Sequence, residues 1–176
     1  MSTYDLKYEG QNCRKAVALG VFRDGHVLVA KSSAGRSDAN PDTCHLPSTG
    51  VKGARHGESF DNPRKTFERE LGNFNLSYGD LSGVKQNDNW QDFVHEAPAD
   101  KQKYYSYQGH KVLLGNLREG VEPNVRFSFS YSSFEWVKIS TQADIDALVA
   151  RFPEFKRDCG RKIIMRAVEK GFLTLE

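Results

Sequence analysis

The stretch from His45 to Leu76 reads H-L-P-S-T-G-V-K-G-A-R-H-G-E-S-F-D-N-P-R-K-T-F-E-R-E-L-G-N-F-N-L, and it decides the fold. Its first half contains three glycines and a proline, and these residues predict a loop. The triplet Asp61-Asn62-Pro63 follows. It predicts the start of a helix, with Asn62 as the N-cap and Pro63 at the first helical position.

The predicted helix has one apolar face. Phe67, Leu71 and Phe74 recur at i, i+4 and i+7, which is the spacing of one side of an α-helix. Arg69 and Glu70 lie away from the centre of that stripe. A glycine-rich loop that leads into a helix with a buried face and a charged edge is suited to phosphate or metal binding.

An apolar hairpin precedes this stretch. Ala16 to Phe22 reads A-V-A-L-G-V-F and His26 to Ala30 reads H-V-L-V-A, and both segments predict strands. Asp24-Gly25 between them is the strongest short-range hairpin signal. Further strands are predicted at Cys44–Leu46, Tyr104–Leu114 and Arg126–Val137, and further helices at Thr141–Ala150 and Asp158–Lys170.

The order of these elements is strands, a helix, more strands and two helices, which predicts an α+β sandwich with a mixed central sheet. The 176 residues are expected to form a single domain. Two polar segments, Ser32–Thr43 and Asn87–Lys103, are predicted as surface loops. Thr141 is the expected cap of one late helix and Gly171 the stop of the other.

Composition and charge argue against several classes of protein. The net charge is +2 with interspersed signs, so charge alone gives no strong attraction to nucleic acid or an anionic membrane. No segment has the apolar length needed to span a bilayer, and the N-terminus lacks the apolar core of a signal peptide. Cys13, Cys44 and Cys159 are widely spaced and odd in number, so we expect free thiols in a reducing cytoplasm and no zinc site.

The stretch from Leu46 onward resembles the signature of the Nudix hydrolases, G-x5-E-x7-R-E-U-x-E-E-x-G-U, in which U is apolar. Arg69-Glu70-Leu71 matches R-E-U, and Leu46-Pro47 matches the L-P that precedes the family's glycines. The hairpin, and F-E-W-V-K-I at Phe134–Ile139, also resemble the opening hairpin and the closing strand of Nudix domains. The resemblance implies a Nudix-type α/β/α sandwich, with its core over residues 16–172 of a single domain spanning 1–176.

The match fails in the half of the signature that holds metal in the family. The paired glutamates fall on Asn73 and Phe74, and the closing glycine falls on Leu76. An asparagine offers a neutral oxygen, and a phenylalanine offers no ligand. Gly72-Asn73 is also a helix stop signal, so the helix is expected to end one turn before the family's ligand pair.

The first glutamate of the signature has two candidates. Counted back from Arg69 it falls on Asp61, and Arg69 would then pair with Asp61. Glu58 belongs to a G-E-S triplet that resembles the family's G-E-T or G-E-S, and three residues are then inserted before Arg69. The loop is longer than the family's, so its glycine anchor is either Gly50 or Gly53.

The resemblance implies cleavage of the diphosphate in a nucleoside diphosphate linked to another group, with Mg²⁺ or Mn²⁺ as cofactor. Glu70 would hold the metal with help from Glu58 or Asp61, and Arg69 would orient the site. Glu70 as an ordinary solvent-facing helix residue stays an open alternative. The phosphates would lie on the glycine loop, against Gly50, Gly53, Arg55 and His56.

Two functions therefore stay open. The first is a Nudix-type hydrolase with impaired metal binding, completed by a carboxylate from a loop. The second is a catalytically inactive Nudix-fold module that binds a nucleotide or RNA, and Asn73 and Phe74 favour it. The expected partner is a nucleotide-type small molecule, and no membrane is expected. RNA binding and a homodimer both stay open.

Overall fold

The structure is a computed structural model that describes residues 5–33, 43–86, 89–157 and 159–176. The described strands form one mixed sheet. They are β1 (Leu6–Tyr8), β2 (Gln11–Arg23), β3 (His26–Ser32), β4 (Cys44–His45), β5 (Ser48–Gly50), β6 (Leu81–Gln86), β7 (Val94–Glu96), β8 (Tyr107–Leu117) and β9 (Tyr131–Lys138). The α-helices are α1 (Arg64–Gly72), α2 (Gln142–Arg151), α3 (Glu154–Arg157) and α4 (Gly160–Glu169). Short 3-10 turns are η1 (Ala54–His56), η2 (Tyr78–Asp80), η3 (Trp90–Phe93) and η4 (Ala99–Lys101).

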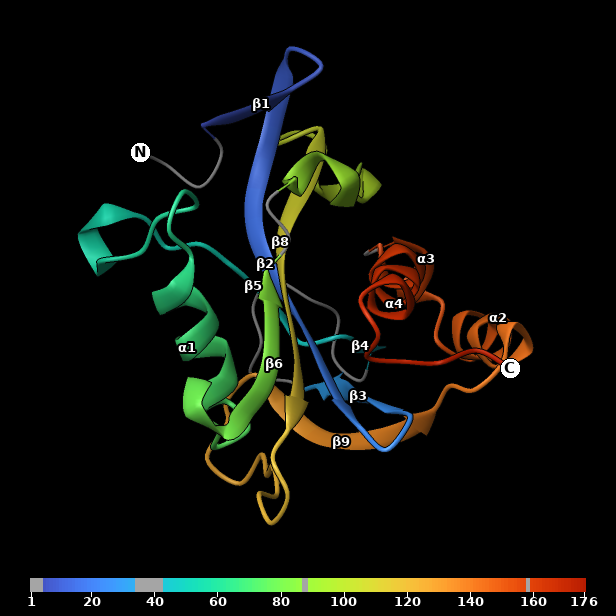
Figure 1. The fold of residues 1–176 in the computed structure, drawn as a ribbon. Helices are drawn as coiled ribbons and strands as arrows, with labels where there is room; N and C mark the ends of the chain where they lie inside the picture. Colours follow the sequence, from blue (N-terminus) through green and yellow to red (C-terminus); the bar gives the residue numbers. More distant parts are fainter. Residues whose placement is uncertain (1–4, 34–42, 87–88, 158) are drawn as a thin grey trace.

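The sheet is built around the parallel pair of β2 and β8, which run side by side from Cys13 and Tyr107 to Phe22 and Asn116. β3, β5 and β1 pair antiparallel with β2, while β6 and β7 pair antiparallel with β8. α1 covers one face of the sheet, and α2, α3 and α4 lie on the other face (Figure 1). The predicted α+β sandwich with a mixed central sheet is therefore confirmed.

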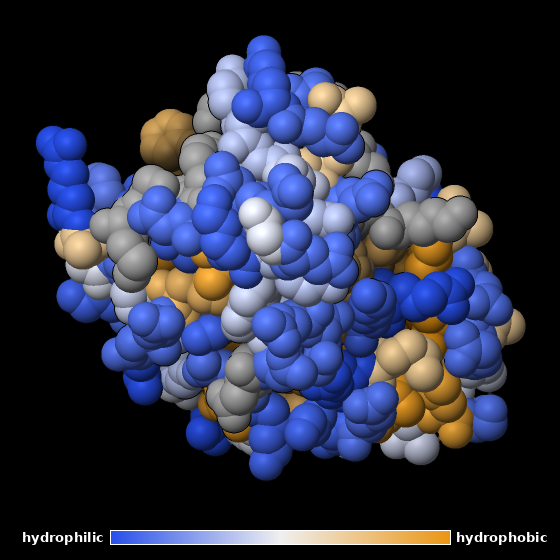
Figure 2. Space-filling view, turned by 90° about the horizontal axis from the view of Figure 1, so that it is seen from above, coloured by the Kyte–Doolittle hydropathy of each residue, from blue (hydrophilic) through white to orange (hydrophobic). Residues whose placement is uncertain are grey.

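Alternation along β2 divides the core between the two faces. Val17, Leu19 and Val21 pack with the buried face of α1. Ala18 and Phe22 point the other way and pack with the helices that follow β9. Successive strand residues point to opposite faces, so one fully buried strand supplies both halves of the core. Seen from above, the end of the molecule near the β1–β2 turn is covered mainly by hydrophilic side chains (Figure 2).

The predicted hairpin is present between β2 and β3. Asp24 and Gly25 have φ values of 48° and 74°. These positive values are typical of a type I′ turn, whose twist matches that of the flanking strands. Thr141 caps α2 with its hydroxyl, and Gly171 follows α4 with a φ of 86°, so both predicted helix boundaries are confirmed.

The structure of α1 agrees with the pattern from which it was predicted. Phe67, Leu71 and Phe74 are buried on the sheet side. The helix begins one residue later than predicted, because Pro63 is its N-cap and Arg64 its first residue. It ends at Gly72, and Asn75 then adopts a left-handed conformation with a φ of 56°. The predicted early stop is confirmed.

The predicted start of the last strand is wrong. The strand expected from Arg126 begins only at Tyr131, and the side chains of Phe127 and Phe129 are 79% and 88% exposed. The Ser128 hydroxyl accepts hydrogen bonds from the backbone N–H groups of Ser130 and Tyr131, and these local bonds compete with strand pairing. Aromatic and polar residues alternate here, but a turn precedes the strand.

The predicted loop Asn87–Lys103 is largely ordered structure, apart from residues 87 and 88, which lie outside the described residues. It contains η3, β7 and η4. Phe93 is buried in the core on the α4 side, and this aromatic anchor explains why the segment folds against β8. Most of the other predicted loop, Ser32–Thr43, also lies outside the described residues.

The three cysteines agree with the expectation from sequence. Cys13, Cys44 and Cys159 are free thiols. Within the described part of the chain, every helix is too short or too polar to cross a bilayer.

Candidate functional site

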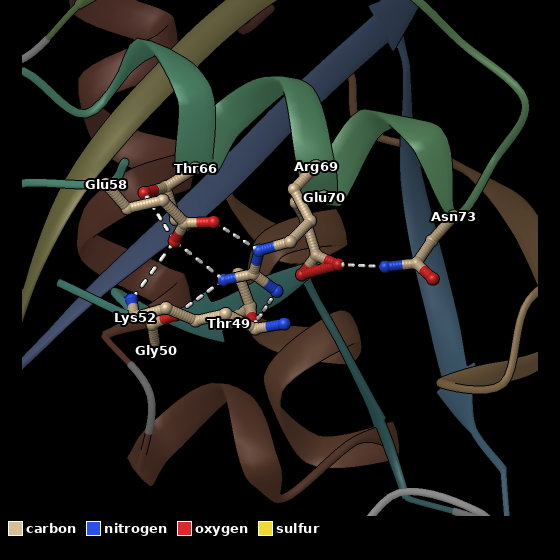
Figure 3. A network of polar contacts seen from close by, with 8 residues as sticks. All are labelled: Thr49, Gly50, Lys52, Glu58, Thr66, Arg69, Glu70 and Asn73. Atoms are coloured by element: carbon tan, nitrogen blue, oxygen red, sulfur yellow. Dashed lines mark hydrogen bonds and ion pairs between the residues drawn. The ribbon is translucent and has the colours of Figure 1, made fainter. Parts of the chain in front are cut away.

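Glu58 and Arg69 form an ion pair between the loop and α1, in which Glu58 is buried and Arg69 is partly exposed (Figure 3). Arg69 Nε donates to Glu58 Oε2 at 2.7 Å, and Arg69 Nη2 donates to Glu58 Oε1 at 3.0 Å. The contact is bidentate, which is the stronger geometry for an arginine and a carboxylate. Glu58 is only 5% exposed. It is therefore Glu58, and not Asp61, that pairs with Arg69.

Further donors complete the surroundings of Glu58. Its Oε1 also accepts from the Lys52 backbone N–H and from the Thr66 hydroxyl, both at 3.0 Å. Burial by itself raises the pKa of the Glu58 carboxyl. The hydrogen bonds and charge of Arg69, with the bonds from Lys52 and Thr66, outweigh burial and hold the pKa below its ordinary value of 4.5.

The expectation that Arg69 pairs with Asp61 is wrong. Asp61 is exposed, just before the helix. Three more residues separate Glu58 from Arg69 than in the family motif. Glu58, and not Asp61, therefore takes the position of the first glutamate. Counting back from R-E-U assumed the family's loop length, whereas the G-E-S triplet was the correct guide.

Arg69 also ties the helix to β5. Its Nη2 donates to the Gly50 carbonyl at 2.8 Å, and its Nη1 donates to the Thr49 hydroxyl at 3.2 Å. Neither Thr49 nor Thr66 was predicted from the sequence to take part in the site. Arg69 thus holds β5, the loop and α1 together, and an orienting role for it in a catalytic site stays a prediction.

Most backbone donors of the glycine loop are already engaged, within the loop or, for the Val51 N–H, by the Lys15 carbonyl of β2. Gly53 has a φ of 90° and its carbonyl accepts from two later N–H groups of the loop. The engaged N–H groups belong to Val51, Lys52, His56, Gly57 and Glu58. Arg55 and His56 lie in η1 with exposed side chains. The structure therefore uses the loop to hold Glu58, and phosphate binding by Gly50, Gly53, Arg55 and His56 stays a prediction.

Glu70 is buried at the other end of α1, with 1% of its surface exposed. The alternative of a solvent-facing Glu70 is wrong. Its Oε1 accepts from Asn73 Nδ2 at 2.6 Å, and its Oε2 accepts from the Tyr131 hydroxyl at 3.0 Å (Figure 3 shows the Asn73 contact). Both carboxylate oxygens therefore face donors supplied by the protein.

Asn73 extends this network across the molecule. Its Oδ1 accepts from the Ser128 hydroxyl at 2.9 Å, and Ser128 in turn holds the turn before β9. The Tyr131 hydroxyl also accepts from the Ser48 backbone N–H at 3.0 Å. Asn73 occupies the position of a family glutamate, yet here its amide links α1 to the start of β9.

Phe74 occupies the position of the second family glutamate and is part of the core. Its ring stacks on Tyr131, with centroids 5.0 Å apart and an interplanar angle of 29°. Such stacked aromatic pairs contribute about 0.5–1.5 kcal/mol beyond area burial. Tyr131 therefore serves two neighbours, because its ring packs on Phe74 and its hydroxyl holds Glu70. The sequence reasoning missed Tyr131 and Ser128, whose partners lie more than fifty residues away in the chain.

These residues do not fit a Mg²⁺ or Mn²⁺ site. Hard divalent cations need several oxygen ligands, with carboxylates to balance their charge. Here an amide N–H points at Glu70 where a cation would need another oxygen ligand. Across the described ranges, no three or more His, Cys, Asp or Glu side chains gather as a metal site. Glu58 is fully engaged by Arg69, Lys52 and Thr66.

No protein-family model and no curated protein sequence matches this chain. Solved structures do resemble it. A bifunctional NMN adenylyltransferase/ADP ribose pyrophosphatase from Francisella tularensis aligns with a TM-score of 0.59 at 17% identity, over 88% of this chain and 40% of that chain. A structure of the same enzyme with AMP and a Mn ion gives 0.60 at 15% identity, over 93% and 43% of the two chains.

Two further structures are similar to this chain. The E. coli dihydroneopterin triphosphate pyrophosphohydrolase aligns with a TM-score of 0.56 at 12% identity, over 84% of this chain and 92% of that chain. A MutT/nudix family protein from Enterococcus faecalis gives 0.50 at 12% identity, over 78% and 47%. The chain spans less than half the length of the Francisella enzyme. At these identities the likeness establishes the fold, and the chain has the Nudix fold.

Proposed function

We propose that this chain binds a nucleotide-type ligand on the Nudix fold and does not carry out metal-dependent cleavage of a diphosphate. The observation that carries the proposal is the pair of donors on Glu70, the Asn73 amide and the Tyr131 hydroxyl. A metal ion bound to Glu70 would have to displace these donors, and in the described part of the chain no group of three or more metal-ligating side chains surrounds it.

The affinity of this position for a metal ion depends on its negative charge. Replacing two glutamates by Asn73 and Phe74 removes two negative charges from the place where the family binds metal. Affinity for hard cations depends on the number and charge of the oxygen ligands. Without the metal, neither a polarised phosphate nor an activated water is available from this half of the motif.

The ligand class is carried over as a proposal from the similar structures. One of them holds AMP, and another is named for dihydroneopterin triphosphate. Both molecules combine a flat nitrogen heterocycle with phosphate. RNA as a ligand, a homodimer and a cytoplasmic location stay predictions.

A second candidate function is a hydrolase of reduced rate, and the intact ion pair of Glu58 and Arg69 favours it. This pair fixes the loop against α1 as the family motif requires. A loop carboxylate would then have to complete the site. The exposed candidates are Glu96, Asp100, Glu119 and Glu122.

One experiment separates the two candidates. Purified protein is incubated with Mg²⁺, and separately with Mn²⁺, and a pooled panel of nucleoside diphosphate derivatives. Glu70→Gln is the test variant, and Glu68→Gln, on the exposed side of α1, is the matched control. Binding of the same compounds is measured in EDTA.

We expect saturable binding in EDTA and no metal-dependent product. Product that needs the metal, and that disappears in Glu70→Gln but persists in Glu68→Gln, would overturn the proposal in favour of the hydrolase.

A further inference from the structure

Two lysines lie on the α1 side of the sheet, next to the glycine loop. Lys15 is on β2 and Lys111 is on β8. In the unbroken register of these parallel strands, Lys15 lies beside Gly109, and Lys111 lies beside Val17. Val17 packs in the core under α1, so residues an even number of positions from it, including Lys15, share its face.

Lys15 is unusually buried for a lysine. It is 6% exposed, and no hydrogen bond or ion pair joins its ammonium to another residue in the described part of the chain. A lysine that extends its stem over apolar surface normally leaves its charged end in water. A covered ammonium without a carboxylate is costly, because burial removes hydration without supplying an opposite charge.

Lys111 is partly buried, and no ion pair involving it is found in the described part of the chain. Its Nζ lies 4.9 Å from the centre of the Phe60 ring, a cation–π contact that leaves the charge without an anion. Strand spacing and rise put the Cα atoms of Lys15 and Lys111 about 8 Å apart. Two long flexible side chains at that separation can reach one anionic group.

Aromatic side chains lie beside Lys111 and beside Gly109, the cross-strand neighbour of Lys15. Trp90 packs directly on Gly109, where an added Cβ would lie 2.8 Å from Trp90 Cε3. The rings of Phe60 and Trp90 meet edge to face at 5.9 Å, and Tyr8 meets Trp90 at 6.2 Å. A charge interaction among aromatic walls is stronger than one in open water.

We infer that Lys15 and Lys111 form a phosphate-binding site that takes the phosphate group of the nucleotide-type ligand. The ligand class rests on the proposed function, whereas the placement of the anion rests on the two lysines. In this site, ammonium groups of the protein supply the positive charge that a metal ion would otherwise supply. Lysine binds phosphate as a compact point charge with several donors.

The test measures binding by calorimetry in EDTA with three probes: ADP, inorganic pyrophosphate and adenosine. The variants are Lys15→Met and Lys111→Met, because methionine keeps most of the stem and removes the charge. Lys162→Met, on the exposed side of α4, is the matched control. Adenosine separates recognition of the base from recognition of the phosphate, and pyrophosphate separates a free phosphate ligand from a nucleotide.

We expect ADP to bind the wild-type protein and each lysine substitution to raise its Kd at least about tenfold, since each removes a charge-assisted contact. Adenosine should bind weakly and equally to all four proteins. Affinity for ADP should also fall as salt rises. Unchanged ADP affinity in both lysine variants overturns the inference.

Thermal unfolding without ligand separates ligand binding from a structural role. If Lys15 serves a ligand, Lys15→Met removes an uncompensated charge, and the melting temperature should stay the same or rise. A clear fall would show that Lys15 stabilises the fold, and this result would count against the inference. If Lys15→Met destabilises the protein, ADP binding to Lys111→Met, whose substitution is at a less buried position, still tests the phosphate site.

The outcome also separates this inference from the proposed function. Metal-dependent cleavage with lysine-dependent ADP binding would remove the proposed function and leave the phosphate site. ADP binding without cleavage, unaffected by either substitution, would leave the proposed function and remove the site. Failure of ADP and pyrophosphate to bind the wild-type protein at millimolar concentration would overturn both.

Discussion

The two ends of α1 carry two kinds of polar structure. At the N-terminal end, Glu58 and Arg69 form a bidentate pair that matches the family motif once the three-residue insertion is recognised. At the C-terminal end, Glu70 is held by Asn73 and Tyr131, two residues that the motif does not contain. One end keeps the arrangement that the motif predicts, and the other end replaces it.

The difference indicates that the two halves of the motif have different roles: one stabilises the fold, and the other binds a cation in the family. The pair of Glu58 and Arg69 joins β5, the loop and α1, so the fold needs it whether or not a metal is bound. A cluster of glutamates serves only a cation, because the like charges repel when the cation is absent. At the C-terminal end, hydrogen bonds inside the protein take the place of that cluster.

The largest effect is expected at the N-terminal end. Arg69→Met leaves the buried Glu58 carboxylate without its cation, and breaking one side of a buried pair typically costs about 3–5 kcal/mol. The free energy of unfolding, from denaturant titration, should fall by that amount. Arg64→Met is the control, because Arg64 pairs with Glu68 on the surface of the same helix and such pairs contribute about 1 kcal/mol or less.

Equal losses in Arg69→Met and Arg64→Met would mean that the buried pair is not the link between β5 and α1. This result would contradict the claim that the pair of Glu58 and Arg69 stabilises the N-terminal end of α1.

A smaller loss is expected at the C-terminal end. Tyr131→Phe keeps the ring on Phe74 and removes the hydroxyl that donates to Glu70. Leaving a buried acceptor without its donor costs about 1–3 kcal/mol. The double variant with Glu70→Gln should show coupling between the two positions in a denaturant-based thermodynamic cycle. Strict additivity would contradict the proposed contact.

The smallest effects are expected from pH. The pKa of Glu58 is below its ordinary value of 4.5, so the ionised form stabilises the folded state above that pH. This contribution should be lost as pH falls through the lowered pKa. Glu58→Gln should remove this contribution to the dependence of the unfolding free energy on pH, while the contributions of other groups remain. An unchanged profile in the variant would show that Glu58 titrates as in the unfolded chain.

His110 should act in a higher pH window. Burial, and the charges of His95 and Arg14, lower the pKa of His110 well below 6.5. The unfolded chain then binds a proton that the folded protein excludes, so stability should fall as pH drops below about 6.5, by at most about 1.4 kcal/mol per pH unit. His110→Asn should flatten the profile between pH 6.5 and pH 5. A profile as steep as that of the wild-type protein would assign the effect to another group.

Local pattern was sufficient to predict much of the fold. The spacing of Phe67, Leu71 and Phe74 predicted α1, and Asp24-Gly25 predicted the hairpin, because both signals depend on neighbours in the chain. The late start of β9 was missed, since Ser128 decides it through local hydrogen bonds that compete with a good strand pattern.

Less of the candidate site could be predicted from the sequence. Two residues in the signature, Asn73 and Phe74, showed that the family's paired glutamates are replaced in this sequence. What replaces them was not readable, because Tyr131 meets Glu70 across 61 positions of the chain and Ser128 meets Asn73 across 55. Burial of Lys15 was also not predicted from the sequence.

The most direct test of the central claim is the thermal midpoint with and without millimolar Mg²⁺ or Mn²⁺. The central claim is that the C-terminal end of α1 no longer binds a metal ion. Three proteins are compared: the wild-type protein, Glu70→Gln, and Asn73→Asp, which restores a second carboxylate beside Glu70. Binding to the folded state alone raises the midpoint, so the shift reports occupancy.

We predict no metal-dependent shift in the wild-type protein or in Glu70→Gln. Asn73→Asp should melt lower than the wild-type protein in EDTA, because two carboxylates repel, and should regain stability with Mn²⁺. A rise of the wild-type midpoint with Mg²⁺ or Mn²⁺ that Glu70→Gln abolishes would contradict the account, since Glu70 would then be a working metal ligand.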